Sequence, residues 1–299
     1  MSSQYFRFLS RSAEPRRSAL LEQLLARADA FKPVSDWRAD AFRLLVPQTV
    51  SVPATASAAL CADCGAVDAA WVCLATPVHY VAEMTNVRMS CDGILSLTPA
   101  AAEALATHFN QVWNGSGIRM LAGGSAHLYC IFEQTLHVTT RDPQDALNRH
   151  IEEYLPAGAD APRLRRLMSE IEMWLFEHEA NSSRATLSLP RMSGLWLWGG
   201  GAPLASLPKI PGWAAGDDVF FSAFKGEKSG SGVIVASDAP GGTGWHDVES
   251  RWLKVAAAQL RAGTLTRVDL SAEDRCFTVN AHAIRRFWRR SKPWWEFFA

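Results

Sequence analysis

The sequence predicts an α/β protein, in which strands form a sheet flanked by helices. Short apolar runs typical of buried strands alternate along the chain with amphipathic helical segments, which is the pattern of α/β proteins. The chain has 299 residues, 48% of them hydrophobic and 20% charged, so it can bury a large core. At about 150 residues per domain, this length favours two domains.

The first part of the chain is expected to begin with a helix and to continue mainly with strands. Residues 15–31 carry leucines at helical spacing. Residues 42–46, 69–74 and 81–89 are apolar or alternating runs expected to form strands. The stretch 47–59 is rich in Pro, Ala and Ser and is expected to be a loop.

The middle of the chain is expected to alternate helices with strands. A helix is predicted from Thr98 to about Trp113, because Thr98 can cap it and Pro99 fits its first turn. Strands are predicted at 118–121 and 127–132.

The last part of the chain repeats this alternation. A longer helix begins at Asp160 and carries an apolar stripe that indicates a core face. The other elements expected are a helix at 145–154, strands at 195–198, 219–224, 232–236, 265–270 and 276–279, and a helix at 247–261.

Composition and charge exclude several classes of protein. Lys plus Arg and Asp plus Glu each number 30, so the sequence does not favour nucleic-acid binding through the whole surface. The longest early uncharged run, 44–62, is too polar for a membrane span. The N-terminus lacks the apolar region of a signal peptide, and the six cysteines lack a framework spacing. We therefore expect a cytoplasmic protein with reduced thiols and no membrane contact.

Residues that can bind metals are present but scattered. Cys61 and Cys64 have the spacing of half a zinc site, yet no second pair follows at similar spacing. The eight histidines form no pair at metal-binding spacing on a predicted helix. His246 and Asp247, beside a glycine-rich loop, could transfer protons, although a capping Asp with a surface His is the simpler interpretation. The sequence thus predicts no metal ion and no cofactor.

Two places are candidates for binding an anion. Trp198 ends an apolar run, and the three glycines at 199–201 would let N–H groups approach a ligand closely. The alternative is a tight crossover between packed elements. Asn181 and Arg184 could present an amide and a guanidinium to one phosphate. The alternative there is a surface salt bridge.

Residues 284–299 are the most basic and aromatic part of the chain, with five basic residues, one acidic residue and six large rings. Arginines interleaved with rings suit single-stranded nucleic acid, a membrane interface or an acidic protein. The alternative is a last helix whose rings dock on the domain while its arginines stay solvated.

A series of short motifs occurs in order along the chain. Leu195-Trp-Leu-Trp-Gly-Gly-Gly201 is followed by Phe224-Lys-Gly226, and Gly123-Gly-Ser-Ala-His-Leu-Tyr129 lies upstream. Further motifs stand at 97–105, 142–145, 155–158, 181–184 and 242–244. Over roughly residues 78–245, this series resembles the archaeal-type cofactor-independent phosphoglycerate mutases.

The resemblance implies an alkaline-phosphatase-like fold and, in the mutases, two divalent metal ions with a Ser nucleophile that carries the phosphoryl group. This sequence departs from that pattern. The first 76 residues contain no Asp-Gly-x-x-Asp turn, and no Asp-x-x-Gly-His or Gly-Asp-His follows Gly244. Met84, Ala126 and Gln144 stand where the family has Arg, Arg and His. Phosphoryl transfer needs such ligands to neutralise developing charge.

A second resemblance is to the RpfE-type regulatory proteins of bacteria. Their Trp-x-Trp-Gly-Gly-Gly segment and terminal Arg-Phe-Trp-Arg-Arg run appear here at 196–201 and 286–290. This resemblance implies a regulatory role. The two resemblances together imply a reduced alkaline-phosphatase-like core at residues 1–92 and 193–299, with an inserted α+β domain at 93–192.

We therefore expect a catalytically inactive mutase relative that acts as a regulatory protein and senses a phosphorylated metabolite. The candidate ligand-binding residues are Asn181, Arg184, Asp145, Trp198, Gly199, Gly200, Gly201 and Lys225. One alternative is a metal-dependent phosphoglycerate mutase or phosphoesterase, with ligands among Asp63, Asp68, Asp238, His246 and Asp247. The other is a protein that binds nucleic acid or a protein partner through residues 284–299.

Overall fold

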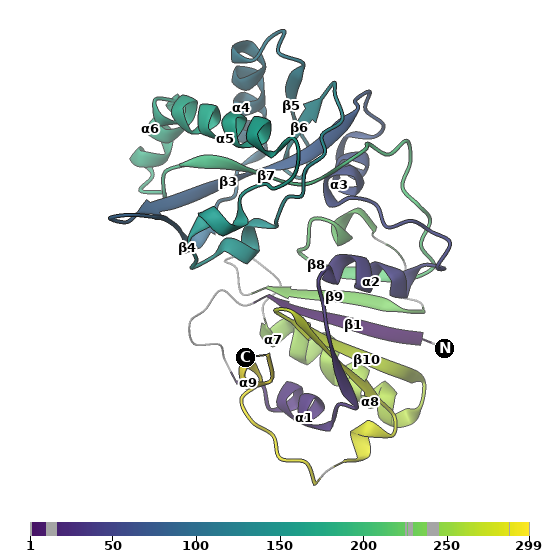
Figure 1. Cartoon of the computed structure of the whole chain (residues 1–299). Helices are drawn as coiled ribbons and strands as arrows, with labels where there is room; N and C mark the ends of the chain where they lie inside the picture. Colours follow the sequence, from purple (N-terminus) through teal and green to yellow (C-terminus); the bar gives the residue numbers. More distant parts are fainter. Residues whose placement is uncertain are drawn as a thin grey trace. The chain divides into compact units, whose positions relative to one another are not determined.

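The computed structural model describes residues 2–9, 17–224, 226, 230–237, 245–286 and 288–298. The chain folds into two compact units (Figure 1). The first unit consists of Met1–Val52 and Pro208–Ala299, and the second of Pro53–Leu207. Each unit combines a sheet with helices, which confirms the predicted mixed α/β class.

The first unit contains a six-stranded sheet. Its order is β2 (Ala30–Pro33), β11 (Arg275–Asn280), β10 (Leu265–Ala272), β1 (Ser2–Leu9), β9 (Gly232–Ser237) and β8 (Trp213–Gly216). The strands from β10 to β8 run parallel, whereas β11 and β2 pair antiparallel. Strand β1 lies inside the parallel part, where both faces are usually covered. Its residues Tyr5, Phe6 and Phe8 are accordingly all buried.

One face of this sheet carries a large hydrophobic core. The helices that pack there are α1 (Ala19–Arg27), α7 (Trp245–Val248), a π-helical turn (Glu249–Leu253), α8 (Lys254–Ala262) and α9 (Trp295–Phe298), the last preceded by a 3-10 turn (Ala283–Arg285). Helix α1 begins at Ser18, whose hydroxyl accepts a hydrogen bond from the Leu21 N–H (3.3 Å). Its buried leucines pack against Phe6 and Ile234 of the sheet, so helix and sheet share one core.

The opposite face is covered in part by aromatic residues. Helix α2 (Trp37–Leu45) packs on β1 and β9, and a 3-10 turn (Phe221–Phe224) lies beside β8. The ring of Phe42 lies 5.5 Å from that of Phe220 and 5.1 Å from that of Phe224. These tilted contacts hold the helix and the turn together.

A buried ion pair joins the same two elements. Arg38 of α2 donates to Asp218 Oδ2 from Nε (3.0 Å) and Nη2 (2.7 Å). The other carboxylate oxygen of Asp218 accepts the N–H groups of Phe220 and Phe221, both at 3.1 Å. Asp218 therefore neutralises a buried arginine and caps the 3-10 turn at the same time.

The second unit contains a five-stranded antiparallel sheet. The long strand β3 (Trp71–Ala82) pairs with β4 (Val87–Ile94), β6 (Leu128–Phe132) and β7 (Gly194–Gly201), and β5 (Ile118–Ala122) pairs with β6. Its helices are α3 (Thr55–Cys64), α4 (Pro99–Val112), α5 (Ala161–Phe176) and α6 (Glu179–Thr186), and its 3-10 turns are Pro143–Ala146 and Ile151–Tyr154. Helices α3 and α5 pack on β7, α4 packs on β5, and α6 packs on α5.

The two units divide the chain differently from the predicted domains. The predicted insertion covered 93–192, whereas the second unit spans Pro53–Leu207. Strands β3 and β7 lie outside the predicted insertion, yet they pair with each other, and β3 also pairs with β6 and β4. Because a sheet cannot be divided without breaking its ladder of hydrogen bonds, the strands that flank the predicted insertion fold with it.

Some predicted elements have a different local structure. Most of the predicted strand 42–46 belongs to α2, which begins where the Asp36 carboxylate accepts the Ala39 N–H (2.9 Å). The predicted loop 47–59 contains the start of α3. The predicted strand 219–224 contains the 3-10 turn that Asp218 caps, and the predicted helix 145–154 is largely two 3-10 turns.

Other predicted elements are confirmed, with small shifts at their ends. They are α1, α4, α5, β5, β6, β7, β9, β10 and β11. Strands β1 and β8 and helix α6 were not predicted, and β2 begins within the end of the predicted helix 15–31. None of the helices in the described part of the chain is both long enough and apolar enough to cross a bilayer.

Replacing Asp218 by Ala should destabilise the first unit strongly. The change removes both hydrogen bonds between Asp218 and the buried Arg38 guanidinium and uncaps the 3-10 turn, at a cost of about 3–5 kcal/mol. Asp274→Ala is the control, because the Asp274 side chain is 79% exposed and lies 3.9 Å from Arg275. Its effect should stay within about 0.5 kcal/mol. Urea unfolding of both variants tests this, and equal midpoints would contradict it.

Candidate functional site

The three glycines at the end of β7, Gly199 to Gly201, allow close packing. The N–H of Gly199, which has a positive φ of 67°, donates to Thr140 Oγ1 (3.0 Å). A Cβ atom on Gly200 would overlap the Trp71 ring, and one on Gly201 would lie 2.5 Å from the Ala54 Cβ. Of the two interpretations of this segment, the contacts favour the crossover between packed elements.

Trp198, just before these glycines, is buried and has a partner for its polar atom. Its indole N–H donates to Thr76 Oγ1 on the neighbouring strand β3 (2.8 Å). The hydrogen bond fixes the ring within the sheet. Trp198 therefore stabilises the β3–β7 pair.

Asn181 ties α6 to its surroundings. Its side-chain Nδ2 donates to the carbonyls of Leu175 (2.7 Å) and Met192 (2.9 Å), and its Oδ1 accepts the Met192 N–H (2.8 Å). Both amide hydrogens are thus used, in a residue that is only 8% exposed. These hydrogen bonds tie the Leu175 and Met192 backbones together, and binding of an anion by Asn181 stays a prediction.

Arg184 lies one turn further along α6 and is half-buried. Its Nε donates to the Pro190 carbonyl (2.6 Å), and burial lowers the pKa of its guanidinium. The group remains a cation at neutral pH, because the pKa of arginine is normally above about 12. In the described part of the chain its guanidinium forms no ion pair, so it keeps donors for an anion.

Two other predicted ligand-binding residues, Asp145 and Lys225, supply no further described contact near the Arg184 guanidinium. Asp145 is exposed in the 3-10 turn Pro143–Ala146, and its N–H donates to the Asp142 carbonyl (3.0 Å). Lys225 lies outside the described residues. The glycines at the end of β7 contact Thr140, Trp71 and Ala54, whereas Asn181 and Arg184 of α6 contact the backbones of Leu175, Met192 and Pro190. The two groups of predicted ligand-binding residues therefore share none of these contacts.

The proposed metal ligands have protein partners where the structure describes them. Asp63 accepts hydrogen bonds from Ser125 Oγ (2.6 Å) and Tyr129 Oη (2.8 Å). Burial and this contact raise the pKa of Tyr129, so its hydroxyl stays a donor. Asp247 pairs with Arg251 of the next helical turn (3.6 Å).

The remaining metal-binding candidates are placed as follows. The backbone carbonyl of Asp68 accepts from Arg119 (2.9 Å), while Asp238 and the His246 side chain lie outside the described residues. Cys61 and Cys64 are free thiols on α3. Within the ranges that the structure describes, no group of three His, Cys, Asp or Glu side chains has a geometry that could hold a metal ion.

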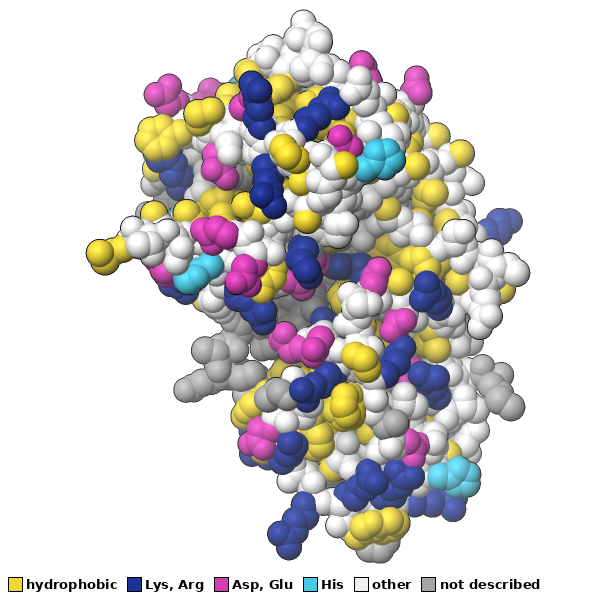
Figure 2. Space-filling model, in the orientation of Figure 1, with side chains coloured by type: hydrophobic (Ala, Val, Ile, Leu, Met, Phe, Trp, Pro, Cys, Tyr) yellow, Lys and Arg dark blue, Asp and Glu magenta, His cyan; other side chains and the backbone are white. Residues whose placement is uncertain are grey.

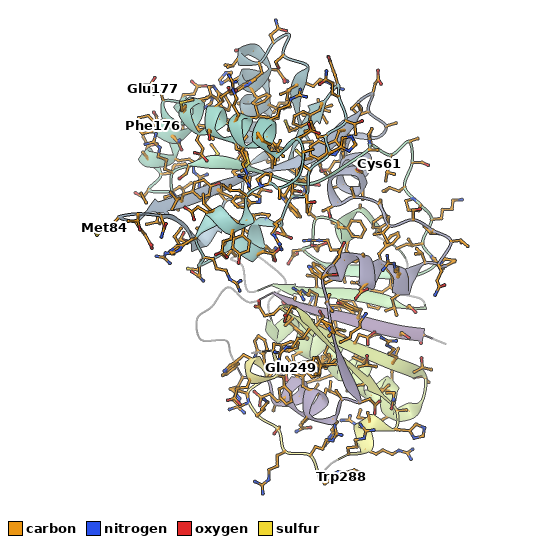
Figure 3. The ribbon with its side chains drawn as sticks, viewed as in Figure 1. Cys61, Met84, Phe176, Glu177, Glu249 and Trp288 are labelled. Atoms are coloured by element: carbon orange, nitrogen blue, oxygen red, sulfur yellow. The ribbon has the colours of Figure 1, made fainter. Side chains whose placement is uncertain are left out.

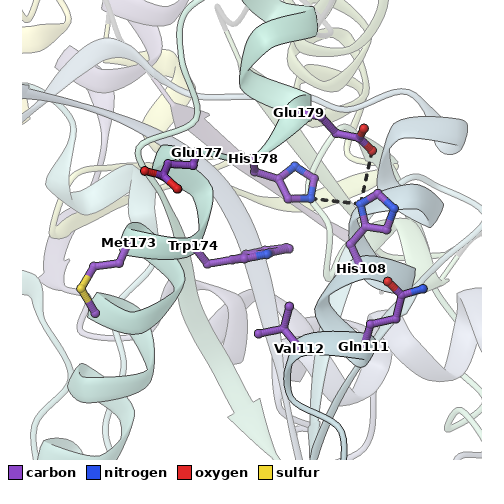
Figure 4. A pocket seen from close by; sticks show the side chains of 8 residues that line it. All are labelled: His108, Gln111, Val112, Met173, Trp174, Glu177, His178 and Glu179. Carbon is purple, nitrogen blue, oxygen red and sulfur yellow. Dashed lines mark hydrogen bonds and ion pairs between the residues drawn. The ribbon is translucent and has the colours of Figure 1, made fainter.

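A surface pocket of about 510 Å³ brings together two histidines that lie far apart in the sequence (Figure 4). His108 of α4 and His178, just before α6, face each other, with Nδ1 of the first 3.1 Å from Nε2 of the second. Glu179 Oε1 lies 3.4 Å from the same His108 nitrogen. The sequence carried no signal for this pair, because its members are 70 positions apart and share no motif.

The hydrogen bonds of this pair assign its protons. His178 Nδ1 accepts the Ala180 N–H (3.1 Å) and caps α6, so a neutral His178 carries its proton on Nε2 and donates to His108. A metal ion bound to Nε2 would move the proton of the neutral ring to Nδ1. Nδ1 could then no longer accept the Ala180 N–H, so the cap of α6 would be lost. Burial, followed by the charge of His108, lowers the pKa of His178, while Glu179 acts in the opposite direction.

Comparison with known proteins relates the chain to one enzyme family. No protein-family model matches the sequence. The 2,3-bisphosphoglycerate-independent phosphoglycerate mutase of Methanothrix thermoacetophila is 30% identical to it over 160 residues, which are 52% of this chain and 40% of the mutase. The chain therefore spans about two fifths of the length of this curated relative. The sequence shows distant homology to the cofactor-independent phosphoglycerate mutases.

Two solved structures are also similar to the chain. A cofactor-independent phosphoglycerate mutase from Thermoplasma acidophilum has a TM-score of 0.39 at 10% identity, covering 98% of this chain and 93% of the mutase. A protein from Pyrococcus horikoshii has a TM-score of 0.40 at 9% identity, covering 93% and 87%.

Replacing Gly200 by Ala should destabilise the second unit by roughly 1–3 kcal/mol, because the new methyl group overlaps the Trp71 ring in a packed interior. Gly124→Ala is the matched control, since a Cβ atom there meets nothing within 4 Å. Denaturant unfolding of both variants is the measurement. A Gly200→Ala midpoint equal to that of wild type would show that the ring has room to move.

Acidification should weaken the cap of α6. Because the folded pKa of His178 is lowered, the unfolded chain binds a proton first, and the free energy of unfolding falls as the pH drops through about 6.5. Asn at position 178 keeps a capping oxygen without titrating. The loss of stability between about pH 7.5 and pH 5 should be smaller in His178→Asn than in wild type.

Thermal unfolding across this pH range measures the effect. His282→Asn, at an exposed histidine of the first unit, is the control and should follow wild type. If the free energy of unfolding of His178→Asn falls with pH as much as that of wild type, the titration of His178 is not the cause of the pH dependence.

Proposed function

We propose that this chain is a phosphoglycerate-mutase relative that binds a phosphorylated metabolite as a regulatory protein and does not transfer the phosphoryl group. The sequence homology over about half of the chain supports the relationship to the mutases. The resemblance to the RpfE-type proteins supports a regulatory role inside the cell.

The observation that carries the proposal is the set of partners around Asp63. Phosphoryl transfer by two divalent ions needs carboxylates that face the metal. Here both carboxylate oxygens of Asp63 accept protein hydroxyls, Ser125 on one and Tyr129 on the other. Asp247 likewise faces Arg251. These contacts support a protein that binds its ligand without metal-assisted chemistry.

Arg184 is the residue that we assign to the phosphate. A half-buried guanidinium interacts more strongly with an anion than an exposed one, because less water screens the charge. The hydrogen bond from Nε to Pro190 fixes the plane of the group and leaves both Nη atoms for a bidentate contact. Asn181 holds α6 against Met192 and so positions Arg184 indirectly.

Replacing Arg184 by Gln should abolish the response to 3-phosphoglycerate. Wild type at about 100 times the dissociation constant of the ligand should gain about 2.7 kcal/mol in unfolding free energy. The variant should gain nothing, because its amide cannot replace the charged fork. Thermal unfolding with increasing ligand, with and without Mn²⁺, measures both proteins.

Arg166→Gln is the matched control, since Arg166 is 82% exposed and pairs with Glu170 on α5. It should respond like wild type. An unchanged response of Arg184→Gln would refute the assignment of Arg184. A response that requires Mn²⁺, with conversion of 3- to 2-phosphoglycerate, would favour the metal-dependent enzyme.

A further inference from the structure

An exposed loop near the C-terminus is held between two buried anchors. Its described residues are 285–286 and 288–293, most of them exposed and without helix or strand beyond Arg285. Ile284 before it is 5% exposed, and Trp294 and Phe298 after it are 3% and 5% exposed. All three belong to the hydrophobic core of the first unit. The interpretation in which the terminal rings dock on the domain therefore holds for Trp294 and Phe298.

Hydrogen bonds to the end of α1 fix the loop further. Arg286 Nη2 forms an ion pair with Asp29 (2.5 Å), and Arg289 Nη1 donates to the Ala28 carbonyl (2.8 Å). In return, Arg27 Nη1 donates to the Ile284 carbonyl (3.0 Å). Cations at the C-terminal end of a helix also interact favourably with its dipole. The loop is therefore held in place on the first unit.

In its described residues the loop presents one large exposed ring among cations. Trp288 is 67% exposed and is the one large hydrophobic side chain exposed among the described residues from 283 to 298. Arg285, Arg290 and Lys292 of the same loop are also exposed. Figure 3 labels Trp288 at the bottom of the view, and Figure 2 shows Lys and Arg side chains near an exposed hydrophobic group in the same part of the view.

We propose that this loop binds single-stranded nucleic acid. An exposed indole offers a flat face on which a base can stack, and neighbouring cations neutralise the phosphates on either side. In this arrangement Trp288 stacks on a base, and Arg285 and Arg290 contact the backbone. Binding of this kind tolerates many sequences, because every base has a π-face.

The same observations disfavour a membrane surface. Membrane binding scales with the apolar area that enters the bilayer, and among the described residues 285–286 and 288–293 the Trp288 ring is the one large apolar group that is exposed. The carboxylates of an acidic peptide would pair with the cations of the loop, but such a peptide offers no flat face on which the Trp288 ring could stack. A strand of bases and phosphates uses both the ring and the cations. This loop belongs to the first unit, so the proposal is independent of Arg184 in the second.

The test is fluorescence anisotropy of a labelled oligouridylate or oligothymidylate of about 12 nucleotides, with the full chain at low salt. Wild type should bind saturably. Trp288→Ala should weaken binding about tenfold through loss of stacking, and Trp288→Phe should retain most of it because a ring remains.

The paired change Arg285→Gln with Arg290→Gln should reduce the dependence of binding on salt. The slope of log K against log salt is negative, and each lost phosphate contact should reduce its magnitude by about 0.7. Because the altered side chains are exposed, the thermal unfolding of these variants should match that of wild type.

Exposed residues of the second unit serve as controls: Phe176→Ala, and Arg163→Gln with Arg166→Gln. Both should bind the oligonucleotide like wild type. The proposal is overturned if Trp288→Ala binds unchanged, if wild type shows no saturable binding at low salt, or if Trp288 is needed only for binding to anionic lipid vesicles or to polyglutamate.

Discussion

The antiparallel pairing of β3 with β7 is the constraint on which the second unit depends. It aligns Thr76 with Trp196 and Ala75 with Leu197, while the other edge of β3 receives β6 and β4. Helices α3 and α5 then pack on β7. The pairing is possible because Gly200 leaves room for the Trp71 ring. A side chain at Gly200 would force apart the elements that the rest of the unit is built on.

Many polar side chains that stand out in the sequence satisfy the backbone or one another. Asn181 closes the connection around α6, Asp63 accepts two hydroxyls, and Asp218 neutralises Arg38 while it caps a turn. A buried polar group without a partner costs free energy, so such partners are usually found. The cations left for a ligand are those near the surface, and for this reason both proposals rest on arginines.

The two proposed sites use arginine in different ways. Arg184 is half-buried and fixed through one nitrogen, which suits directional binding of a single anion. Arg285 and Arg290 are exposed beside a ring, which suits salt-sensitive binding along a polymer. Because the sites belong to different units, each can be altered without touching the other.

The sequence by itself determined the α/β class, most of the amphipathic helices and several buried strands, because these follow from local spacing and capping residues such as Thr98. It also indicated the relationship to the mutases and the basic character of the C-terminal segment. Only the tertiary structure decided that β3 and β7 fold with the segment between them, and that Asn181 serves α6. It alone brought His108 to His178 and left Trp288 exposed. Those outcomes depend on contacts between residues far apart in the sequence, which local patterns cannot encode.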